Sequence, residues 1–328
     1  MTKNLIASFE THGREPILRR MKNGNLICMF LTGGVTEPYN DNVVAIARSY
    51  DDGETWTKPE TVFQHNYRGC WCTEVFTECE KPFAIVQTYN APAHYRELQT
   101  FRSFCDDSGE NWAEPVSIRG INGSSVRQGF TLSNGDILFP LYWQEVNAMF
   151  NWPNKLNGWN TKEWPFVCGV AISSDNGETF TRYGDIRSDV FLWEPNAVEI
   201  EDGHIIMYCR GGAPAMFISE SFDYGRTWSE PVRSNIPNPD TKITVLKVRG
   251  QILMINNFQS EHGKRTDLYI AKSSDGKNFE KIIEVENKDE SFFYPHAFAD
   301  DEKEILYVAY ENKKDHWLKK YTYKELGL

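Results

Sequence analysis

The sequence predicts an all-β protein, a six-bladed β-propeller whose blades are four-stranded antiparallel sheets. Two observations predict this fold: an eight-residue pattern, Ser-x-Asp-x-Gly-x-Thr-Trp or a close variant, recurs along the chain, and six short turns are flanked by apolar, strand-like runs. Repeats of about fifty residues suit four short strands, the usual unit of a propeller. Six such units use the whole chain, so we expect a single domain over residues 1–328.

The eight-residue pattern carries the chemistry of a hairpin turn. Its Asp and Ser side chains can bond backbone amides of the turn, its Gly supplies a positive φ, and its aromatic residue can pack beneath as an apolar plug. We call the pattern an Asp box and expect every copy to be structural. The copies are Ser49–Trp56, Cys105–Trp112 with Asp107 as the central aspartate, Ser173–Phe180, Ser221–Trp228, and Ser273–Phe279, which has lost one residue.

The six turns set the number of blades. Five lie before or between the boxes and the sixth follows the last box, and most precede a strand-like run such as residues 26–30 or 205–208, which is typical of a hairpin. The turns are Asn23-Gly24, Glu80-Lys81, Asn134-Gly135, Asp202-Gly203, Arg249-Gly250 and Asp301-Glu302.

The third repeat contains an excess segment. Successive boxes start 56, 68, 48 and 52 residues apart, and the longest step includes Trp143, Trp152, Trp159 and Trp164 among Asn, Gly and Pro residues. A long aromatic loop on a rigid scaffold serves as a rim over a binding site or as a subunit contact. We favour the rim.

Composition and charge narrow the class of protein. The net charge of −11 argues against coating nucleic acid or an anionic membrane, and no stretch approaches the length of a membrane span. The first ten residues hold no apolar run long enough for a signal peptide. The seven scattered cysteines complete no zinc pattern, so we expect reduced, mostly buried thiols in a cytoplasmic protein without metal or cofactor.

Candidate site residues lie outside the boxes, in a definite order along the chain. Arg14 begins an Arg-Glu-Pro sequence, Asp41 lies shortly before the first box, and Arg210 follows Glu194 by sixteen residues. Arg265 comes just before the fifth box, Tyr294 follows it by 29 residues, and Glu311 comes last.

These residues resemble the site pattern of the sialidase (neuraminidase) superfamily, and the resemblance covers essentially the whole chain. It implies that Arg14, Arg210 and Arg265 grip a substrate carboxylate and that Glu311 steadies Arg14. It also implies a Tyr294 nucleophile assisted by Glu194, with Asp41 as acid/base. Two positions depart from the pattern: Glu15 replaces the family's Ile, and Pro295 replaces a small residue.

Physical chemistry agrees with the implied roles. A guanidinium fork binds a carboxylate through two hydrogen bonds, so three convergent arginines suit an acidic sugar. Tyrosine has a pKa of about 10 and needs a nearby base to act as a nucleophile. We therefore expect Tyr294 within hydrogen-bond reach of Glu194, in a central cleft opposite the Asp-box face. The leading interpretation is an exo-acting, retaining glycoside hydrolase whose partner is a glycan or acidic sugar.

Two other functions fit the same residues. A polysaccharide lyase would remove a proton beside a uronate carboxylate, with Tyr294 or a neighbouring His12 or His296 as base. A non-catalytic glycan-binding propeller would keep the arginines and the aromatic loop without needing Asp41 or the pairing of Glu194 with Tyr294. Each candidate taken singly also has an ordinary alternative, as a surface arginine, a core tyrosine or a solvated carboxylate.

Overall fold

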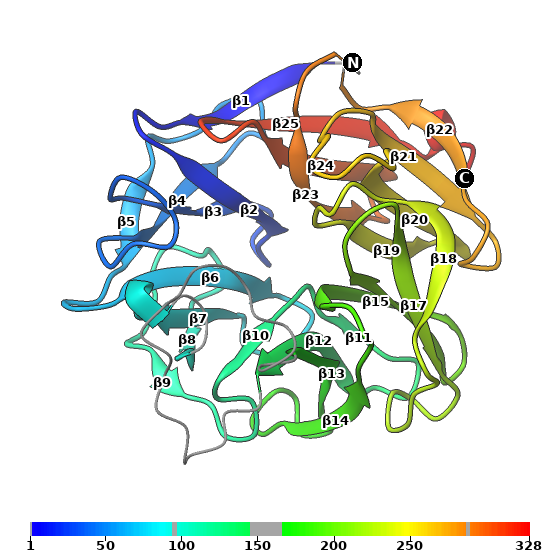
Figure 1. Ribbon diagram of the computed structural model, residues 1–328. Helices are drawn as coiled ribbons and strands as arrows, with labels where there is room; N and C mark the ends of the chain where they lie inside the picture. The colour runs from blue at the N-terminus through cyan, green and yellow to red at the C-terminus, as the bar shows by residue number, and fades with distance from the viewer. Residues whose placement is uncertain (1, 94–96, 145–165, 287–288) are drawn as a thin grey trace.

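The computed structural model describes residues 2–93, 97–144, 166–286 and 289–328. Six antiparallel sheets stand around a central axis (Figure 1), which confirms the predicted six-bladed propeller. In chain order, the strands of the first three blades are β2 (Gly13–Arg20), β3 (Leu26–Thr32), β4 (Val43–Ser49), β5 (Glu60–Phe63); β6 (Gly69–Phe76), β7 (Phe83–Tyr89), β8 (Gln99–Phe104), β9 (Val116–Ser117); and β10 (Ser124–Val126), β11 (Phe130–Thr131), β12 (Ile137–Gln144), β13 (Phe166–Ser173), β14 (Thr181–Ile186).

The other three blades repeat this plan, and the chain ends close the ring. The strands are β15 (Trp193–Glu201), β16 (His204–Arg210), β17 (Ala215–Ser221), β18 (Val232–Pro237); β19 (Thr244–Val248), β20 (Gln251–Asn257), β21 (Leu268–Ser273), β22 (Glu280–Glu284); and β23 (Phe293–Asp300), β24 (Ile305–Glu311), β25 (Asp315–Thr322), β1 (Lys3–Ser8). The N-terminal strand β1 thus pairs with β25 as the outermost strand of the last blade. That the chain is one domain stays a prediction.

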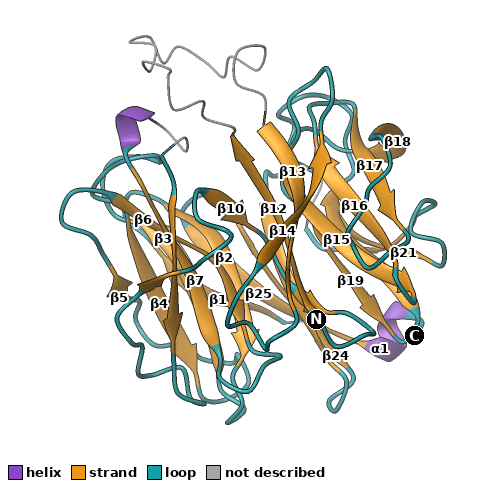
Figure 2. Ribbon diagram, turned by 90° about the horizontal axis from the view of Figure 1, so that it is seen from below, coloured by secondary structure: helices purple, strands orange, loops and turns teal. Residues whose placement is uncertain are grey.

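Apolar side chains fill the spaces between neighbouring blades. Each of the six interfaces has its own buried cluster; Ile17 and Met29 of the first blade, for example, pack with Cys70 and Val86 of the second. All seven cysteines are free and buried, as expected. Strands of the blades run between two loop-bearing faces (Figure 2), so side chains at the two strand ends reach opposite faces of the ring.

The Asp boxes close the hairpins between the third and fourth strands of the first five blades. In the fourth blade, Asp223 Oδ1 accepts hydrogen bonds from the backbone N–H groups of Arg226 at 3.0 Å and Thr227 at 2.8 Å. The box aromatics pack against the interblade clusters, as predicted: Trp56, Trp112, Phe180, Trp228 and Phe279.

One box assignment was wrong. We expected Asp107 to be the central aspartate of the second box, but Asp106 accepts the turn hydrogen bonds, from the N–H groups of Ser108 and Glu110. The sixth blade ends instead in the short helix α1 (Tyr323–Leu326), whose Thr322 and Glu325 cap each other.

Five of the six blades share an irregularity in the innermost strand that positions the site. An extra residue interrupts the pairing of β2, β6, β15 and β23 with their neighbours, and in the third blade residues 127–129 separate β10 from β11. Bulges of this kind redirect a side chain out of the regular alternation. Most of the Trp-rich segment lies outside the described residues. The prediction that this segment forms a rim therefore falls outside the described part of the chain too.

Candidate functional site

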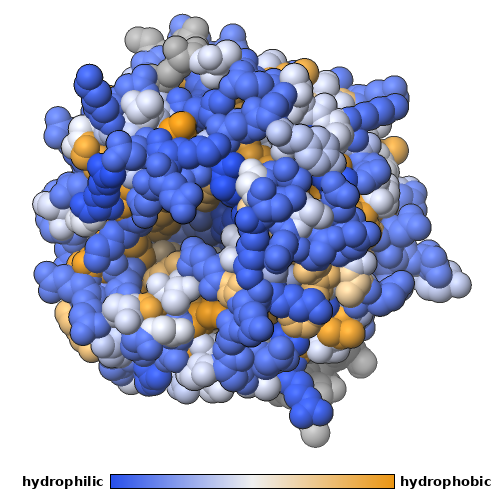
Figure 3. Space-filling model, turned by 180° about the vertical axis from the view of Figure 1, so that it is seen from behind, coloured by the Kyte–Doolittle hydropathy of each residue, from blue (hydrophilic) through white to orange (hydrophobic). Residues whose placement is uncertain are grey.

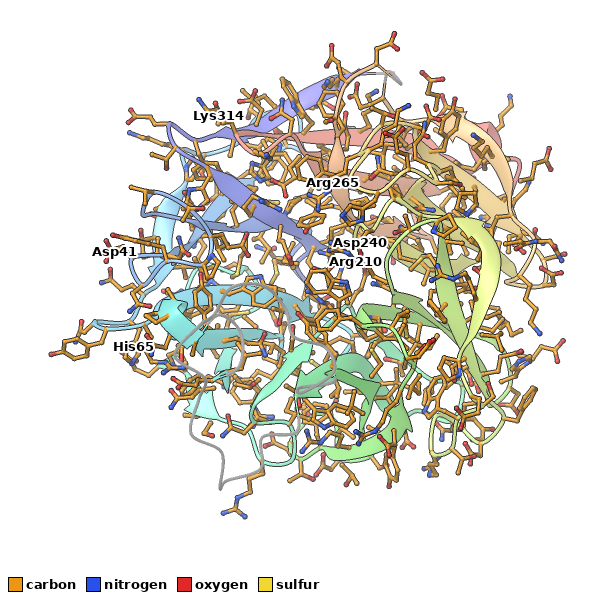
Figure 4. The ribbon with its side chains drawn as sticks, in the orientation of Figure 1. Asp41, His65, Arg210, Asp240, Arg265 and Lys314 are labelled. Carbon is orange, nitrogen blue, oxygen red and sulfur yellow. The ribbon has the colours of Figure 1, made fainter. Side chains whose placement is uncertain are left out.

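Six of the seven predicted site residues gather at one end of the central channel. Arg14 pairs with Leu31 at the start of β2, whereas the other end of that strand pairs near Ser49 and the first Asp box. Arg210 and Glu311 end β16 and β24 opposite the starts of β15 and β23. The site therefore lies on the face opposite the Asp boxes, as expected, and Figure 4 shows Arg210 and Arg265 near the ring centre.

Three arginines surround Tyr294, which is only 7% exposed. The guanidinium carbons of Arg14 and Arg265 each lie 4.9 Å from the centre of the Tyr294 ring, and Arg210 Nη1 lies 3.4 Å from its hydroxyl oxygen. Cationic groups over a tyrosine ring are held by its negative face. The sequence prediction of three convergent arginines thus has a concrete geometry, with the tyrosine hydroxyl among them.

Carboxylates orient two of the arginines. Glu311 Oε1 accepts a hydrogen bond from Arg14 Nε at 3.0 Å, and Asp240 Oδ1 accepts one from Arg210 Nε at 2.7 Å. The first contact matches the supporting position that the sequence suggests for Glu311. Arg265 has no hydrogen bond or ion pair from its guanidinium group to the described part of the chain. Arg265 is therefore available to an anion.

Glu194 and Tyr294 are linked through an arginine. Glu194 Oε2 accepts a hydrogen bond from Arg210 Nη1 at 2.7 Å, and the same nitrogen reaches the Tyr294 hydroxyl. Its other oxygen, Oε1, accepts from Arg127 Nη2 at 3.2 Å. The hydrogen bonds among the described residues include none directly between Glu194 and Tyr294. We expected a direct contact; the guanidinium of Arg210 takes that place instead.

A buried ionic group beneath the arginines was missed by sequence reasoning. Arg127 Nη1 donates to Glu15 Oε2 at 2.9 Å, and Lys242 Nζ lies 3.7 Å from the same oxygen. These residues come from the first, third and fifth blades, so the contacts cross the channel. A signal for Arg127 was present in the sequence: it precedes Asn134-Gly135 by seven residues, much as Glu194 and Tyr294 precede their own turns.

Burial and charge set the ionisation of the carboxyl groups. Burial alone would raise the pKa of Glu194, but Arg210 and Arg127 outweigh it and lower that pKa to about 2. Glu311 has one arginine, so burial dominates and raises its pKa to about 7. Burial, and then the charge of Glu194, raise the pKa of Tyr294 above its usual value, against the lowering effect of the three arginines.

The predicted acid/base residue lies apart from this cluster. Asp41 is exposed on the loop between β3 and β4, and Figure 4 shows it toward the outer part of the first blade. On the same loop, Glu37 is nearly buried, and its Oε2 lies 3.9 Å from Arg14 Nη1. Glu37 is therefore the loop carboxylate close to the arginines.

The two histidines weighed as lyase bases differ in position. His296 is buried one level deeper, where its Nδ1 accepts from the Leu18 N–H at 3.2 Å, and burial lowers its pKa well below the usual value. His12 lies beside Arg14, and burial lowers its pKa too. Glu74 is an ion-pair partner of Arg19 at that deeper level.

The channel has a second opening on the opposite face. A cavity of about 640 Å³, lined by the far ends of the innermost strands, opens there, and Figure 3 shows the hollow at the centre of that face. Among its charged residues, Arg19 pairs with Glu74 and Arg20 pairs with Asp300. Within the described ranges, no cluster of His, Cys, Asp or Glu is suited to hold a metal ion, and no helix is long enough to cross a membrane.

Comparisons with known proteins agree with the fold. The profile of a family described as BNR repeat-like domain matches residues 24–307. A sialidase from Trypanosoma cruzi is 23% identical over 326 residues, which cover 85% of this chain and 26% of that protein. The chain thus spans about a quarter of that relative's length.

Solved structures show the same propeller. The Hadza microbial sialidase Hz136 matches with a TM-score of 0.76 and 18% identity, over 95% of this chain and 66% of that one. A protein of unknown function from Dyadobacter fermentans matches with a TM-score of 0.74 and 16% identity, over 97% and 96% of the two chains. A mutant Trypanosoma rangeli sialidase displaying trans-sialidase activity matches with a TM-score of 0.71 and 17% identity, over 100% and 58%. At these identities, the likeness demonstrates a shared fold.

Proposed function

The chain belongs to the BNR repeat-like domain family, and on that premise we propose that it is a sialidase-like, exo-acting glycoside hydrolase that releases a carboxylate-bearing sugar. The observation that carries the proposal is the convergence of Arg14, Arg210 and Arg265 around the hydroxyl and ring of Tyr294. Arginine forks bind carboxylates through paired hydrogen bonds, and Arg265, whose guanidinium has no ion pair with the described residues, supplies a charge that a substrate can neutralise.

In the proposed reaction, Tyr294 is the nucleophile. Its Oη attacks the anomeric carbon while its proton passes to the Glu194 carboxylate, and the bond from that carbon to the leaving oxygen breaks. The leaving oxygen takes a proton from an acid group. That group, now ionised, takes a proton from water, whose oxygen displaces Tyr294 as the proton returns from Glu194. Two displacements at one carbon retain its configuration, and a neutral nucleophile avoids repulsion by the anionic substrate.

Two carboxyl groups compete for the acid role. Asp41 is the residue that the sequence resemblance selects, and its loop is on the site face. Glu37 is supported by a specific observation, its position 3.9 Å from Arg14 at the edge of the arginine cluster. We keep both as candidates, because a single pair of variants separates them.

A mechanism-based label tests the nucleophile. A fluorinated sugar acid with a good leaving group should leave a covalent adduct on Tyr294, found by peptide mass spectrometry. Tyr294→Phe removes the attacking oxygen while keeping the ring between Arg14 and Arg265, so activity should fall by about 10³-fold or more with binding retained. Full activity in this variant would rule out the nucleophile role.

The paired oxygens of Glu194 support a second candidate, a non-catalytic glycan-binding propeller. Both oxygens already accept from guanidinium groups, which is a stable arrangement for a residue that only shapes a binding surface. A binder would hold the sugar acid without turning it over. The third possibility, a lyase with Tyr294 as base, would give an unsaturated product absorbing in the ultraviolet and no adduct. The labelling experiment, combined with an assay for ultraviolet-absorbing product, therefore separates all three.

A further inference from the structure

The interrupted strands bring three charged residues to one level of the channel. Glu15 and Glu194 occupy the same bulge position in β2 and β15, with φ of 50° and 44°, and a proline follows each. Arg127 stands at the corresponding break between β10 and β11. The guanidinium of Arg127 bridges the two carboxylates, at 2.9 Å from Glu15 Oε2 and 3.2 Å from Glu194 Oε1.

We propose that Arg127, itself held by Glu15, is a positioning residue that orients the Glu194 carboxylate toward Arg210 and Tyr294 and keeps it ionised. The inference rests on the proposed function, because it concerns the residue that would take the proton of Tyr294. It explains the substitution of Glu for the expected apolar residue at position 15: without Glu15, one arm of the Arg127 fork would have no carboxylate partner on the first blade.

The geometry allows Arg127 no other obvious task. Its side chain is 1% exposed, so it lies beneath the surface that a substrate would meet. Its guanidinium carbon also lies 4.9 Å from the ring centre of Trp71 and 5.6 Å from that of Tyr142, so two aromatic rings hold it as well. Because both arms of the Arg127 guanidinium are hydrogen-bonded, the Glu194 carboxylate is held in one orientation, with Oε2 directed at Arg210 Nη1.

Several charged groups face Glu194, and their balance determines when it is ionised. Arg210 and Arg127 contact it directly, Lys242 adds positive charge from the fifth blade, and Tyr294 and Tyr142 face it as neutral phenols. Loss of Arg127 removes one of its two guanidinium partners, while burial continues to favour the protonated acid. Glu194 should then bind a proton at higher pH, and the base form needed for catalysis should disappear sooner on acidification.

The test compares variants that separate positioning from folding. Arg127→Met alone leaves Glu15 with only the distant Lys242, and breaking one side of a buried pair destabilises. The double variant Glu15→Gln with Arg127→Met removes one charge of each sign and should fold. Arg127→Lys keeps the charge but loses the fork. Arg102→Met is the matched control, since Arg102 is a buried arginine paired with Glu178, remote from the site.

Two readouts decide the proposal. Carbon-13 NMR of the Glu194 carboxyl group, assigned with Glu194→Gln, should show no titration between pH 4.5 and 8 in the wild type. In the double variant it should titrate within that range, because one guanidinium is gone. Release of the sugar acid should show a kcat lower by about 100-fold, little change in KM, and an acid limb shifted to higher pH. Arg127→Lys should fall between, and Arg102→Met should match the wild type in both readouts.

A folded double variant with unchanged Glu194 titration, kcat and acid limb would overturn the proposal and leave Arg127 a structural residue. Wild-type protein that releases no acidic sugar would instead defeat the proposed function. The NMR titration would still decide whether Arg127 controls the ionisation of Glu194, so the two failures are distinguishable.

Discussion

Glu311→Gln is the change whose effect follows most directly from the structure. Glu311 is fully buried, and its Oε1 accepts hydrogen bonds from Arg14 Nε at 3.0 Å and from the Glu15 N–H at 3.3 Å. Its other oxygen lies 3.7 Å from His316 Nε2, and neither of those two atoms has a hydrogen-bond partner in the described part of the chain. A glutamine can keep both bonds through its carbonyl oxygen, so the variant removes ionisation and little else.

The sign and size of the effect follow from linkage. The guanidinium of Arg14 stays charged at any accessible pH, so the carboxyl group bears the shift, and burial raises the pKa of Glu311 from 4.5 to about 7. A raised pKa means that the folded state holds a proton that the unfolded state has released. The associated stability is therefore complete below pH 4.5 and is lost as pH rises through about 7. At 1.36 kcal/mol per pKa unit, this amounts to about 3 kcal/mol.

Urea unfolding of both proteins at a series of pH values measures this effect. The free energy of unfolding of the wild type, relative to Glu311→Gln, should fall by about 3 kcal/mol between pH 4.5 and pH 8. Burial also raises the pKa of Glu74 to about 7, but Glu74 titrates in both proteins and cancels in the difference. The KM for an acidic sugar should respond to the same protonation of Glu311. Below pH 7 Glu311 is neutral and no longer offsets the positive charge of Arg14, so the KM of the wild type should be lower there than at higher pH. The KM of Glu311→Gln should not show this change with pH.

A difference in stability that is independent of pH would refute this reasoning, because it would mean that Glu311 has the same pKa in both states. A difference that grows with pH would refute it more directly. In that case the pair with Arg14 would outweigh burial, and the carboxyl group would be ionised throughout.

The remaining predictions concern the Asp-box turn of the fourth blade and the residue that serves as the general acid. Asp223→Ala should lower the free energy of unfolding by about 1–2 kcal/mol, because it removes the hydrogen bonds to the Arg226 and Thr227 N–H groups; lost activity at unchanged stability would contradict a purely structural Asp box. Loss of the general acid should slow hydrolysis of substrates with poor leaving groups by about 10²- to 10⁴-fold and spare those with good ones. We expect Glu37→Gln to show this pattern and Asp41→Asn not to, and the reverse result would return the role to Asp41.

The repeats made the fold predictable because each one determines its own local structure. The boxes supply turn hydrogen bonds and an aromatic plug, and the Gly-containing turns supply hairpins, so blade number and strand order follow without long-range information. The misplacement of Asp107 shows the limit of the pattern. Asp106 and Asp107 are adjacent, and only the backbone path decides which one reaches the turn amides.

The site was less predictable because its partners come from different blades. The order of Arg14, Arg210, Arg265 and Tyr294 along the chain could be compared with a known pattern. Arg127 has only its spacing from Asn134-Gly135 as a signal and Asp240 has none, and the roles of both depend on distances between blades. Glu15 was visible in the sequence as a departure, yet its partner sits 112 residues away. Buried charges from different blades meet only when the blades close into a ring, so the order of residues along the chain does not reveal such pairs.

The interrupted strands explain why chemistry is concentrated at one level of this propeller. In a regular strand, side chains alternate between the two faces, which here are the apolar interfaces between blades. An extra residue with positive φ breaks the alternation, and Glu15, Glu194 and Tyr294 occupy this position with φ of 50°, 44° and 53°. Proline follows each of them, because a missing N–H costs nothing where the ladder is already broken. Such backbone costs about 1–3 kcal/mol per residue and persists only where the surrounding frame imposes it. The ring imposes it in the first, fourth and sixth blades, where a carboxylate or a phenol occupies the position without altering the fold.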